Sequence, residues 1–377
     1  MAHKKNSPGR VRDAIVGVLE DARSPLRVAQ IIEAVQAELG SVAASSVRSY
    51  LNLNTPSVFV RERRGVYRLK QPAARSFRQR SFLDSNTTDS SETVGLATLI
   101  NADCLPWMER REPCTVHAIL TDPPYGLHEY SPEQQQKLRD GRGGVWRIPP
   151  SFDGHKRSPL PRFTTLDERQ LHEIADYFQY WATLAMRILV PGANVVVASN
   201  PMVSHIVSTA MSQGGLERRG EIVRLTMTMR GGDRPKGAHD EFDQVSVMPR
   251  SMWEPWLVFR KPIEKRVQDN LRKWKTGGFR RPCHERPFGD VISSSPTRAK
   301  EKKIAPHPSL KPQAFLRQVA RGILPMGEGV VLDPFAGAGS TLAACNRVGY
   351  SSIGIELDAE YFRMAIDAIP LLEKINS

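Results

Sequence analysis

The spacing of hydrophobic and polar positions divides the chain into two patterned regions joined by a stretch without a pattern. Between residues 11 and 53, apolar positions recur at helical spacing in three blocks, and residues 58–69 contain two short strand-like runs around a turn. From residue 94 onward, β-branched runs alternate with helical stretches, which predicts an α/β domain over residues 94–377. Residues 71–93 lack periodicity and are rich in Ser, Asp and Arg, so we expect a linker there.

The first region, residues 1–70, resembles a winged helix-turn-helix DNA-binding module. Its third helical block, residues 44–53, carries serines and Arg48 on the face opposite its apolar positions, and residues 61–65 form an arginine-rich turn. In such a module the third helix lies in a DNA groove and the hairpin lies over phosphates. A small helical domain used for protein contacts is the alternative.

The chain is strongly basic, and its positive charge is concentrated in two segments. The 377 residues carry a net charge of +13, with 15 Lys and Arg against 6 Asp and Glu in residues 1–80 and 15 against 5 in residues 260–311. The rest of the chain is therefore acidic. Two such basic segments indicate a polyanionic partner such as nucleic acid.

Composition and cysteine spacing exclude several classes of protein. A content of 40% hydrophobic and 25% charged residues is typical of a globular protein, and no apolar run is long enough to span a bilayer or form a signal segment. The four cysteines have neither Cys-x-x-Cys spacing nor paired histidines nearby, so we expect neither a disulfide framework nor a metal site. We expect a cytoplasmic, nucleoid-associated protein with no membrane partner.

The candidate catalytic residues are Asp122, Pro123, Pro124 and Tyr125. They follow an apolar run that predicts a buried strand, which the prolines must end because they cannot donate to a ladder. Asp122 and the Pro123 carbonyl can accept hydrogen bonds from an exocyclic amine, and Tyr125 offers a face for a base taken out of the duplex. The cluster suits methylation of an exocyclic amine, and a turn with Asp122 as a local cap is the alternative.

A long polar stretch, residues 126–169, follows the candidate catalytic residues. It is rich in Gln, Arg, Gly and Pro. Loops of this length inside a compact domain are usually lids, binding loops or disordered. We expect a mobile loop that closes on substrate, with a disordered insert as the alternative.

Residues 329–356 form the clearest candidate for a cofactor site. A strand is predicted at residues 329–332, a glycine-rich turn at 333–339, and Ser340 and Thr341 open a helix. Glycines let the backbone approach a ligand, and the helix start offers free N–H groups. Glu356 ends the next strand, where an acidic residue can accept hydrogen bonds from ribose hydroxyls. A nucleoside cofactor is favoured over a dinucleotide, because the full G-x-G-x-x-G pattern is absent, and a plain packing turn is the alternative.

Together, the motifs at residues 122–125, 307–312 and 333–339 resemble those of the S-adenosylmethionine-dependent DNA amino-methyltransferases. The catalytic motif precedes the cofactor motif, as in the circularly permuted beta group. The resemblance covers roughly residues 94–370. It implies an α/β fold with a Rossmann-like, seven-stranded, largely parallel sheet, and S-adenosyl-L-methionine as the cofactor.

The resemblance also implies roles for individual positions. The loop at residues 333–339 would hold the methionine end of the cofactor and Glu356 its ribose. Asp103 would lie near the adenine, and Lys311 and Pro312 would close over the cofactor. The expected cofactor-binding residues are Asp103, Lys311, Pro312, Asp333, Phe335, Gly337, Gly339, Ser340, Thr341 and Glu356.

The sequence departs from the family pattern in three places. Ser309-Leu310 stands where the family more often has Thr-Gln, and Ala338 stands where Ser is common. In addition, residues 260–306 leave room only for a short, basic target-recognition segment. We therefore expect a short recognition sequence, relaxed specificity, or recognition that depends partly on the N-terminal module.

The leading expectation is a site-specific DNA methyltransferase that acts on the N6 amino group of a flipped adenine in duplex DNA. Asp122 in place of a serine favours adenine, and cytosine N4 is the alternative target. A non-catalytic DNA-binding regulator that senses the cofactor and an RNA methyltransferase are further alternatives. The resemblance implies a homodimer and leaves a cognate restriction nuclease open as a partner.

Overall fold

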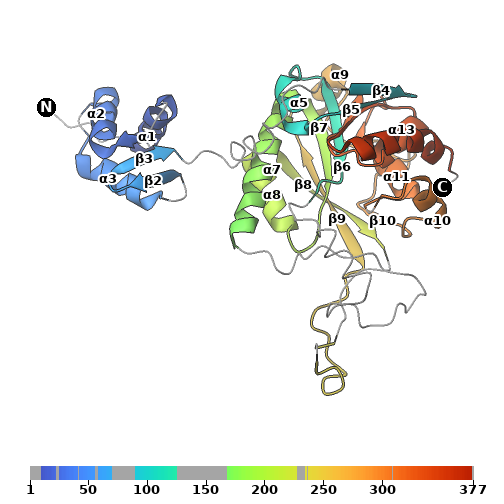
Figure 1. Ribbon diagram of the computed structural model, residues 1–377. Helices are drawn as coiled ribbons and strands as arrows, with labels where there is room; N and C mark the ends of the chain where they lie inside the picture. Colours follow the sequence, from blue (N-terminus) through green and yellow to red (C-terminus); the bar gives the residue numbers. More distant parts are fainter. Residues whose placement is uncertain are drawn as a thin grey trace. The chain divides into compact units, whose positions relative to one another are not determined.

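The computed structural model divides the chain into two compact units, Met1–Leu83 and Asp84–Ser377. It describes residues 10–22, 25–40, 42–55, 58–69, 90–124, 168–226, 234–235, 237–307 and 309–375. The two units are coloured blue and cyan to red in Figure 1. Each unit has its own buried core.

The described residues of the N-terminal unit form three helices and a small antiparallel sheet with the strand order β1-β3-β2. Its core contains Ile15, Ile31, Leu51 and Phe59, which are fully buried. The three helices and the hairpin confirm the prediction from the sequence pattern. Strand β1 was not predicted, because two residues are too few to show a pattern. That this unit is a winged-helix DNA-binding module stays a prediction. Its elements are α1 (Arg10–Asp21), β1 (Leu26–Arg27), α2 (Val28–Leu39), α3 (Ala44–Leu53), β2 (Phe59–Arg63) and β3 (Val66–Leu69).

The second unit is built on one nine-stranded sheet with the order β10-β8-β9-β7-β6-β11-β12-β5-β4. Five of its eight neighbouring pairs are parallel, which confirms the largely parallel α/β fold. Among the described residues the sheet has nine strands and not the expected seven, with β10 and β4 at its two ends. The strands are β4 (Ser90–Val94), β5 (Ala97–Asn101), β6 (Val116–Thr121), β7 (Leu189–Ala198), β8 (Glu217–Leu225), β9 (Trp253–Arg260), β10 (Val291–Ser293), β11 (Val330–Asp333) and β12 (Ser351–Glu356).

Helices cover both faces of this sheet (Figure 1). Helices α5, α7 and α8 pack on one face, while α11, α12 and α13 pack on the other. None of the helices in the described part of the chain combines the length and apolar character needed to cross a membrane. The helices are α5 (Cys104–Arg110), α7 (Glu168–Ile188), α8 (Ser204–Gln213), α9 (Val267–Trp274), α10 (Ala299–Ile304), α11 (Gln313–Ile323), α12 (Ser340–Val348) and α13 (Ala359–Glu373).

The central strand β6 shows why the sheet is buried on both faces. Ile119 packs against the α5, α7 and α8 layer, whereas Ala118 and Leu120 pack against α11 and α12. A strand covered on both faces needs a nearly continuous apolar run, and β6 has one. The pattern of residues 116–121 therefore determines its central position.

Two boundaries differ from the sequence-based expectation. Strand β4 pairs with β5 from Ser90 onward, so the α/β unit begins inside the predicted linker 71–93. The sequence predicts a helix from Leu171 to Leu189 that ends at the pair Pro191-Gly192, but this pair lies within β7, which starts directly after the helix. Gly192 continues the strand because its positive φ of 81° lets its N–H bond to the carbonyl of Lys261 at 3.0 Å.

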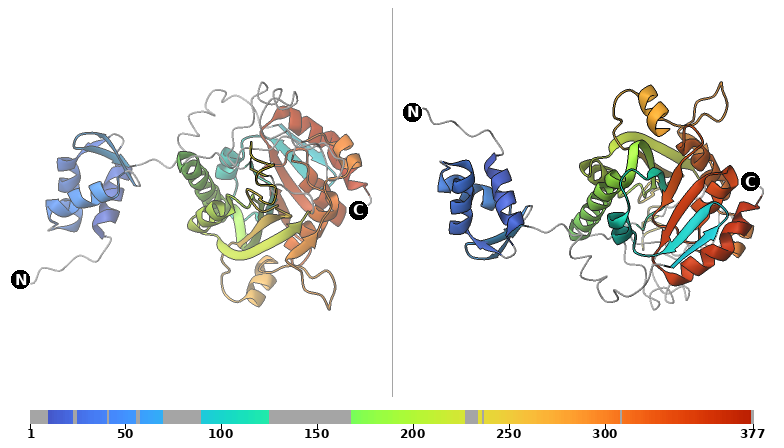
Figure 2. Two further views of the ribbon diagram at one scale, coloured as in Figure 1. Left: turned by 90° about the horizontal axis from the view of Figure 1, so that it is seen from below. Right: turned by 90° about the horizontal axis from the view of Figure 1, so that it is seen from above.

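The strand directions determine which segments of the chain lie at each of the two edges where strands begin or end. We call the edge where β5, β6, β11 and β12 end the carboxyl edge, and the edge where they begin the amino edge. Strand β9 runs antiparallel to β7, which is parallel to β6, so β9 begins at the carboxyl edge and ends at the amino edge. Helix α9 therefore lies at the amino edge, at the top of the sheet in Figure 1 and toward the viewer in the right panel of Figure 2.

Candidate active site

The catalytic and glycine-rich motifs follow two neighbouring strands. Strands β6 and β11 are parallel, and Leu332 pairs with Ile119. The Thr121 hydroxyl at the end of β6 donates a 2.6 Å hydrogen bond to Oδ1 of Asp333 at the end of β11. These residues are 212 positions apart in the sequence. The sheet thus brings the two motifs together at its carboxyl edge, where ligands bind in open α/β sheets.

Residues Asp122, Pro123 and Pro124 leave the sheet directly after β6. Pro123 is buried, Pro124 is exposed, and the side chain of Asp122 is 16% exposed. Tyr125 and residues 126–167 of the predicted mobile loop lie outside the described residues, and the last two residues of that loop, 168 and 169, belong to helix α7. The described part of the motif therefore consists of a partly accessible carboxylate on a proline-fixed backbone.

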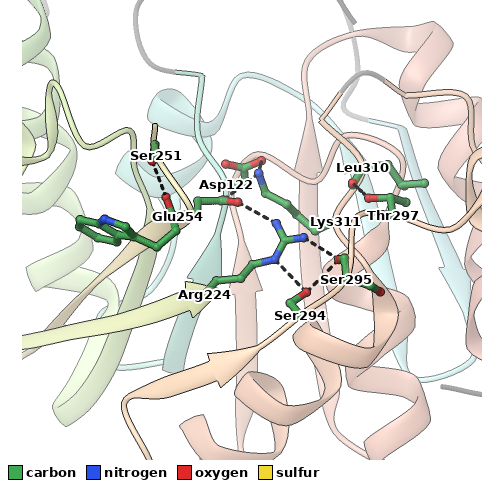
Figure 3. A network of polar contacts seen from close by, with 10 residues as sticks. Asp122, Arg224, Ser251, Glu254, Ser294, Ser295, Thr297, Leu310 and Lys311 are labelled. Carbon is green, nitrogen blue, oxygen red and sulfur yellow. Dashed lines mark hydrogen bonds and ion pairs between the residues drawn. The ribbon is translucent and has the colours of Figure 1, made fainter. Parts of the chain in front are cut away.

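Asp122 is the first member of a series of ion pairs between largely buried side chains (Figure 3). Nζ of Lys311 lies 2.9 Å from Oδ2 of Asp122 and 3.0 Å from Oε1 of Glu254. Nη1 of Arg224 lies 2.7 Å from Oε2 of the same glutamate. Two carboxylates and two cations alternate in this network, which makes it electrically balanced.

The pKa values in this network favour the charged forms. Burial alone would lower the pKa of Lys311, but the carboxylates of Asp122 and Glu254 outweigh it and raise that pKa above its usual value. Burial alone would raise the pKa of Glu254, but Lys311 and Arg224 outweigh it and lower that pKa. Each buried charge is thus stabilised by an opposite charge.

Arg224 and Glu254 are functional candidates that the sequence patterns did not reveal. They are directly paired across the antiparallel strands β8 and β9. Arg224 also donates to Oγ of Ser294 at 3.1 Å and to the carbonyl of Ser295 at 3.2 Å. The available signal was a charged residue next to apolar positions in each of two predicted strands, because a buried charge needs a partner.

Asp333 and Phe335 begin the glycine-rich loop. Burial raises the pKa of Asp333 to about 6, although hydrogen bonds from Thr121 and from the backbone N–H of Phe335 act in the opposite direction. The ring of Phe335 is half-buried and lies 6.5 Å from that of Trp181 at an interplanar angle of 31°. The loop therefore begins with a buried carboxylate next to an aromatic surface.

At two glycines the backbone of the loop passes close to neighbouring side chains. Gly337 and Gly339 have φ values of 51° and 77°, which side chains rarely permit. A Cβ at Gly339 would lie 2.5 Å from Cγ1 of Ile369, and one at Gly337 would lie 3.2 Å from the ring of His307. Only glycine fits both positions without displacement of neighbouring atoms.

Ser340 and Thr341 form the first turn of α12, as predicted, and both are buried. The side-chain amide of Gln313, in α11, donates to the carbonyl of Ser340 at 2.8 Å. Helix α11 thus holds the start of α12 in place. The first N–H groups of α12 lie directly after the glycine loop, where a helix start favours an anionic or electron-rich ligand.

Glu356 and Asp103 complete the carboxyl edge beside this loop. Glu356 ends β12, and its carboxylate accepts hydrogen bonds from the N–H of Gly337 at 2.7 Å and of Asp358 at 2.8 Å. Burial raises the pKa of Glu356. Asp103 follows the adjacent strand β5 and caps α5 by accepting a 2.9 Å bond from the N–H of Leu105. Both acidic residues lie on the edge where the resemblance places them.

The segment before α11 lies across the glycine loop. Leu310 is buried in one cluster with Ala336 and Ala338 of the loop. Lys311 was expected to close over the cofactor together with Pro312, but its ammonium points to Asp122 and Glu254. Pro312 is buried and precedes α11 as its N-cap. The segment therefore connects the glycine-rich loop to the Asp122 carboxylate.

The residues at this edge fit S-adenosyl-L-methionine. Carboxylates of Asp333 and Glu356 suit the positive charges and ribose hydroxyls of that molecule, and Phe335 offers an apolar surface. The backbone at Gly337 and Gly339 cannot carry a side chain without a close contact. Carboxylate, aromatic and backbone groups are thus all present on neighbouring strands.

Comparison with known proteins identifies the family. The family model N6_N4_Mtase, described as DNA methylase, matches residues 116–367. The chain belongs to this DNA methylase family. The Type II methyltransferase M.HindIII of Haemophilus influenzae is 22% identical over 302 residues, which cover 74% of this chain and 96% of that protein. M2.DpnII of Streptococcus pneumoniae is 22% identical over 271 residues, covering 71% and 87%.

Solved structures of low similarity also match this methylase. The PvuII DNA methyltransferase, which is cytosine-N4-specific, has a TM-score of 0.46 at 13% identity and covers 74% of this chain and 86% of its own. The M1.HpyAVI–SAM complex has a TM-score of 0.41 at 16% identity and covers 72% and 99%. Family membership confirms the predicted resemblance to DNA amino-methyltransferases and supports S-adenosyl-L-methionine as the cofactor. The beta-group permutation stays a prediction.

Proposed function

We propose that this DNA methylase transfers the methyl group of S-adenosyl-L-methionine to the N6 amino group of an adenine that leaves the duplex. The observation that carries the proposal is the direct contact between the two motifs at Thr121 and Asp333, which puts the Asp122 carboxylate next to the glycine loop. A methyl acceptor held at Asp122 would therefore lie beside the cofactor. Such alignment of two reactants can supply a large part of a rate enhancement.

The chain's own groups would prepare the amine for attack. The exocyclic nitrogen is a weak nucleophile because its lone pair is delocalised into the ring. The Asp122 carboxylate and the Pro123 carbonyl would accept hydrogen bonds from the N–H groups of this amine. They would also stabilise the positive charge that develops on its nitrogen. When bound, the cofactor would supply an electrophilic methyl group: the bond from methyl to sulfur breaks as the bond from methyl to nitrogen forms, and S-adenosylhomocysteine leaves as a neutral thioether. The nitrogen then loses a proton, for which we propose the Asp122 carboxylate as the acceptor.

Lys311 and Glu254 would fix the orientation of the Asp122 carboxylate before the reaction. The ammonium of Lys311 contacts both acidic residues, so Asp122 is oriented by a group that Glu254 fixes from the other side. A preorganised charge needs little rearrangement when the reaction begins. We propose Tyr125 as the surface on which the flipped base stacks.

Adenine is the proposed target because position 122 carries an aspartate and not a serine. The wider interpretation, methylation of a DNA base, depends only on family membership. Cytosine N4 presents a similar amine and is the second candidate.

The test uses the full-length protein, tritiated S-adenosylmethionine and unmethylated genomic DNA, followed by nuclease digestion and separation of nucleosides. We expect label in N6-methyladenine with the wild-type protein, and none above background with Asp122→Asn. Asp367→Asn, at an exposed position on α13, is the matched control and should retain activity. Label in N4-methylcytosine would overturn the choice of base. No label on DNA despite measurable cofactor binding would favour the cofactor-sensing regulator.

A further inference from the structure

The second basic segment of the chain lies on the side of the sheet away from the candidate active site. Residues 261–290 carry nine Lys and Arg against four Asp and Glu. Because β9 ends at the amino edge, this segment begins there, and it returns toward the carboxyl edge only with β10. Only residues 291–306 of the predicted target-recognition segment 260–306 therefore extend toward Asp122. The charge of residues 261–290 needs another explanation.

Several buried hydrogen bonds fix this segment to the sheet. Nδ2 of Asn270 in α9 donates to the carbonyl of Pro191 at 2.9 Å, and the hydroxyl of Thr276 donates to the same carbonyl at 2.6 Å. Nδ2 of Asn194 in β7 donates to the carbonyl of Gly278 at 2.7 Å. Asn270 and Thr276 are almost completely buried. The basic segment is thus a defined surface held at three points.

Aromatic packing extends the same attachment to α11. The rings of Phe279 and Phe288 stack with centroids 5.1 Å apart. A Cβ at Gly322, near the end of α11, would lie 2.3 Å from the ring of Phe288. Arg280 donates its backbone N–H to the carbonyl of Gly322 at 2.8 Å. The backbone that carries the cations between residues 280 and 286 is therefore packed against α11.

The cations themselves face solvent. Lys265, Arg266, Arg281 and Arg286 are exposed. Arg280, which is half-buried and donates to the hydroxyl of Tyr350, lines a shallow hollow of about 490 Å³ on this surface. The other lining residues include the basic Arg281, His284 and Arg321 and apolar residues such as Leu271, Phe279 and Met326. Guanidinium groups on a rigid support match the geometry of phosphate oxygens. We call α9 and residues 275–286, together with Arg321, the amino-edge surface.

The amino-edge surface is too far from Asp122 to serve the reacting base. Strand β6 has six residues. At a rise of about 3.3 Å per residue, the two edges are separated by about 20 Å along this strand. A base held at Asp122 and a phosphate held by Arg281 would lie on opposite edges of the sheet. Target recognition at the flipped base therefore does not account for this surface.

We propose that the amino-edge surface binds the phosphate backbone of a second segment of duplex DNA, distinct from the segment at the active site. The proposal depends on the family's action on DNA and goes beyond the proposed methylation step. The enzyme would then hold two stretches of DNA at once. Such a contact is independent of sequence, because phosphates carry no base information.

The experiment measures the affinity of the full-length protein for long duplex DNA at several salt concentrations. The variant is R281Q/R286Q, and the matched control is R363Q/K374Q, which removes two exposed cations from α13 and its C-cap. The slope of log Kobs against log salt should become less steep by about 2 in the variant. It should stay at the wild-type value in the control. Turnover at saturating DNA should be unchanged in both proteins.

The outcomes separate this proposal from the proposed function. A wild-type slope in R281Q/R286Q, as expected if the surface binds an acidic protein, would overturn the proposal. So would an equal change in the control, because the effect would then follow net charge alone. Lower turnover at saturating DNA would also count against it, since the surface would then act on the catalytic edge. If the wild-type protein bound DNA but did not methylate it, the proposed function would fail and the slopes would still test this surface.

Discussion

The hydroxyl of Thr121 donates a 2.6 Å hydrogen bond to the buried carboxylate of Asp333 and so joins the end of β6 to the end of β11. This bond favours the ionised form of Asp333, whereas burial favours the protonated form. Burial prevails, and the pKa of Asp333 is about 6. A group that titrates there changes its charge close to neutral pH, within the loop proposed to hold the cofactor.

Cofactor affinity should depend on pH through Asp333. The cofactor carries a positively charged sulfonium and amino group, so the ionised carboxylate should bind it better. We expect affinity, measured by calorimetry, to rise about tenfold as the pH increases through about 6, the effect of roughly one charge-assisted hydrogen bond. Asp333→Asn should bind more weakly and lose this rise. Thr121→Val should move the rise to higher pH, because it removes a bond that stabilises the carboxylate.

The same titration should affect the stability of the free protein. Folding raises the pKa of Asp333 from 3.8 to about 6, so the folded state binds the proton more tightly than the unfolded chain. This contribution to stability is fully present below pH 3.8 and is lost as the pH rises through about 6. Thermal unfolding between pH 4 and 7 should show a smaller pH dependence for Asp333→Asn. Identical profiles for both proteins would contradict the assignment.

Replacing Lys311 with Met should slow catalysis, measured as kcat over a range of pH, and destabilise the fold, measured by urea unfolding. The change leaves Asp122 and Glu254 without the cation that they share, and loss of one partner from a buried ion pair costs about 3 kcal/mol. Carboxylates without this cation favour the protonated form, so the acid limb of kcat should move to higher pH. Lys302→Met, at an exposed position in α10, is the matched control and should change stability by less than about 0.5 kcal/mol.

Glycine-to-alanine changes at the two ends of α12 should differ in their effects. Gly339 and Gly349 have φ values of 77° and 80°, so both changes impose similar backbone strain. A Cβ at Gly349 meets no atom within 4 Å, whereas one at Gly339 lies 2.5 Å from Ile369. Urea unfolding should give a loss of about 1 kcal/mol for Gly349→Ala and about 3 kcal/mol for Gly339→Ala. Only the second should weaken cofactor binding, and equal effects on both would refute the steric argument.

The hairpin of the N-terminal unit should contribute to DNA binding without affecting chemistry. Arg61, Arg63 and Arg64 are exposed on β2 and the turn that follows it. The triple change to Gln should make the salt dependence of DNA affinity less steep by about 3 and leave kcat unchanged. An unchanged slope would instead support a module for protein contacts.

Part of this site could be predicted from the sequence because parallel strands end at the same edge. Asp122, Asp333 and Glu356 each follow an apolar run, and adjacent parallel strands had to place them together. The glycine positions could be predicted for a related reason, since a turn between strand and helix needs positive φ values. Local patterns were sufficient to predict the position of a residue wherever that position follows from the end of a strand.

The charge network could not be predicted, because it depends on strand register and direction. Arg224 and Glu254 meet because β8 and β9 pair antiparallel in one particular register, which no local pattern reveals. The direction of β9 likewise determines that residues 261–290 start at the amino edge and not beside the target base. Lys311 has a long side chain that could reach either the cofactor or Asp122, and only the tertiary structure selects Asp122.

The separation of β6 and β11 in the sequence has a consequence for synthesis on the ribosome. Strand β6 is complete at Thr121, but its neighbour β11 begins only at Val330. During translation the β11-facing side of β6 therefore lacks its partner until some two hundred further residues have been added, and unpaired strand edges promote aggregation. A nascent chain also cannot form the bond between Thr121 and Asp333 before that point. Methylation activity should thus appear late and abruptly during translation, and a ribosome stalled before Val330 should hold a chain without a cofactor site.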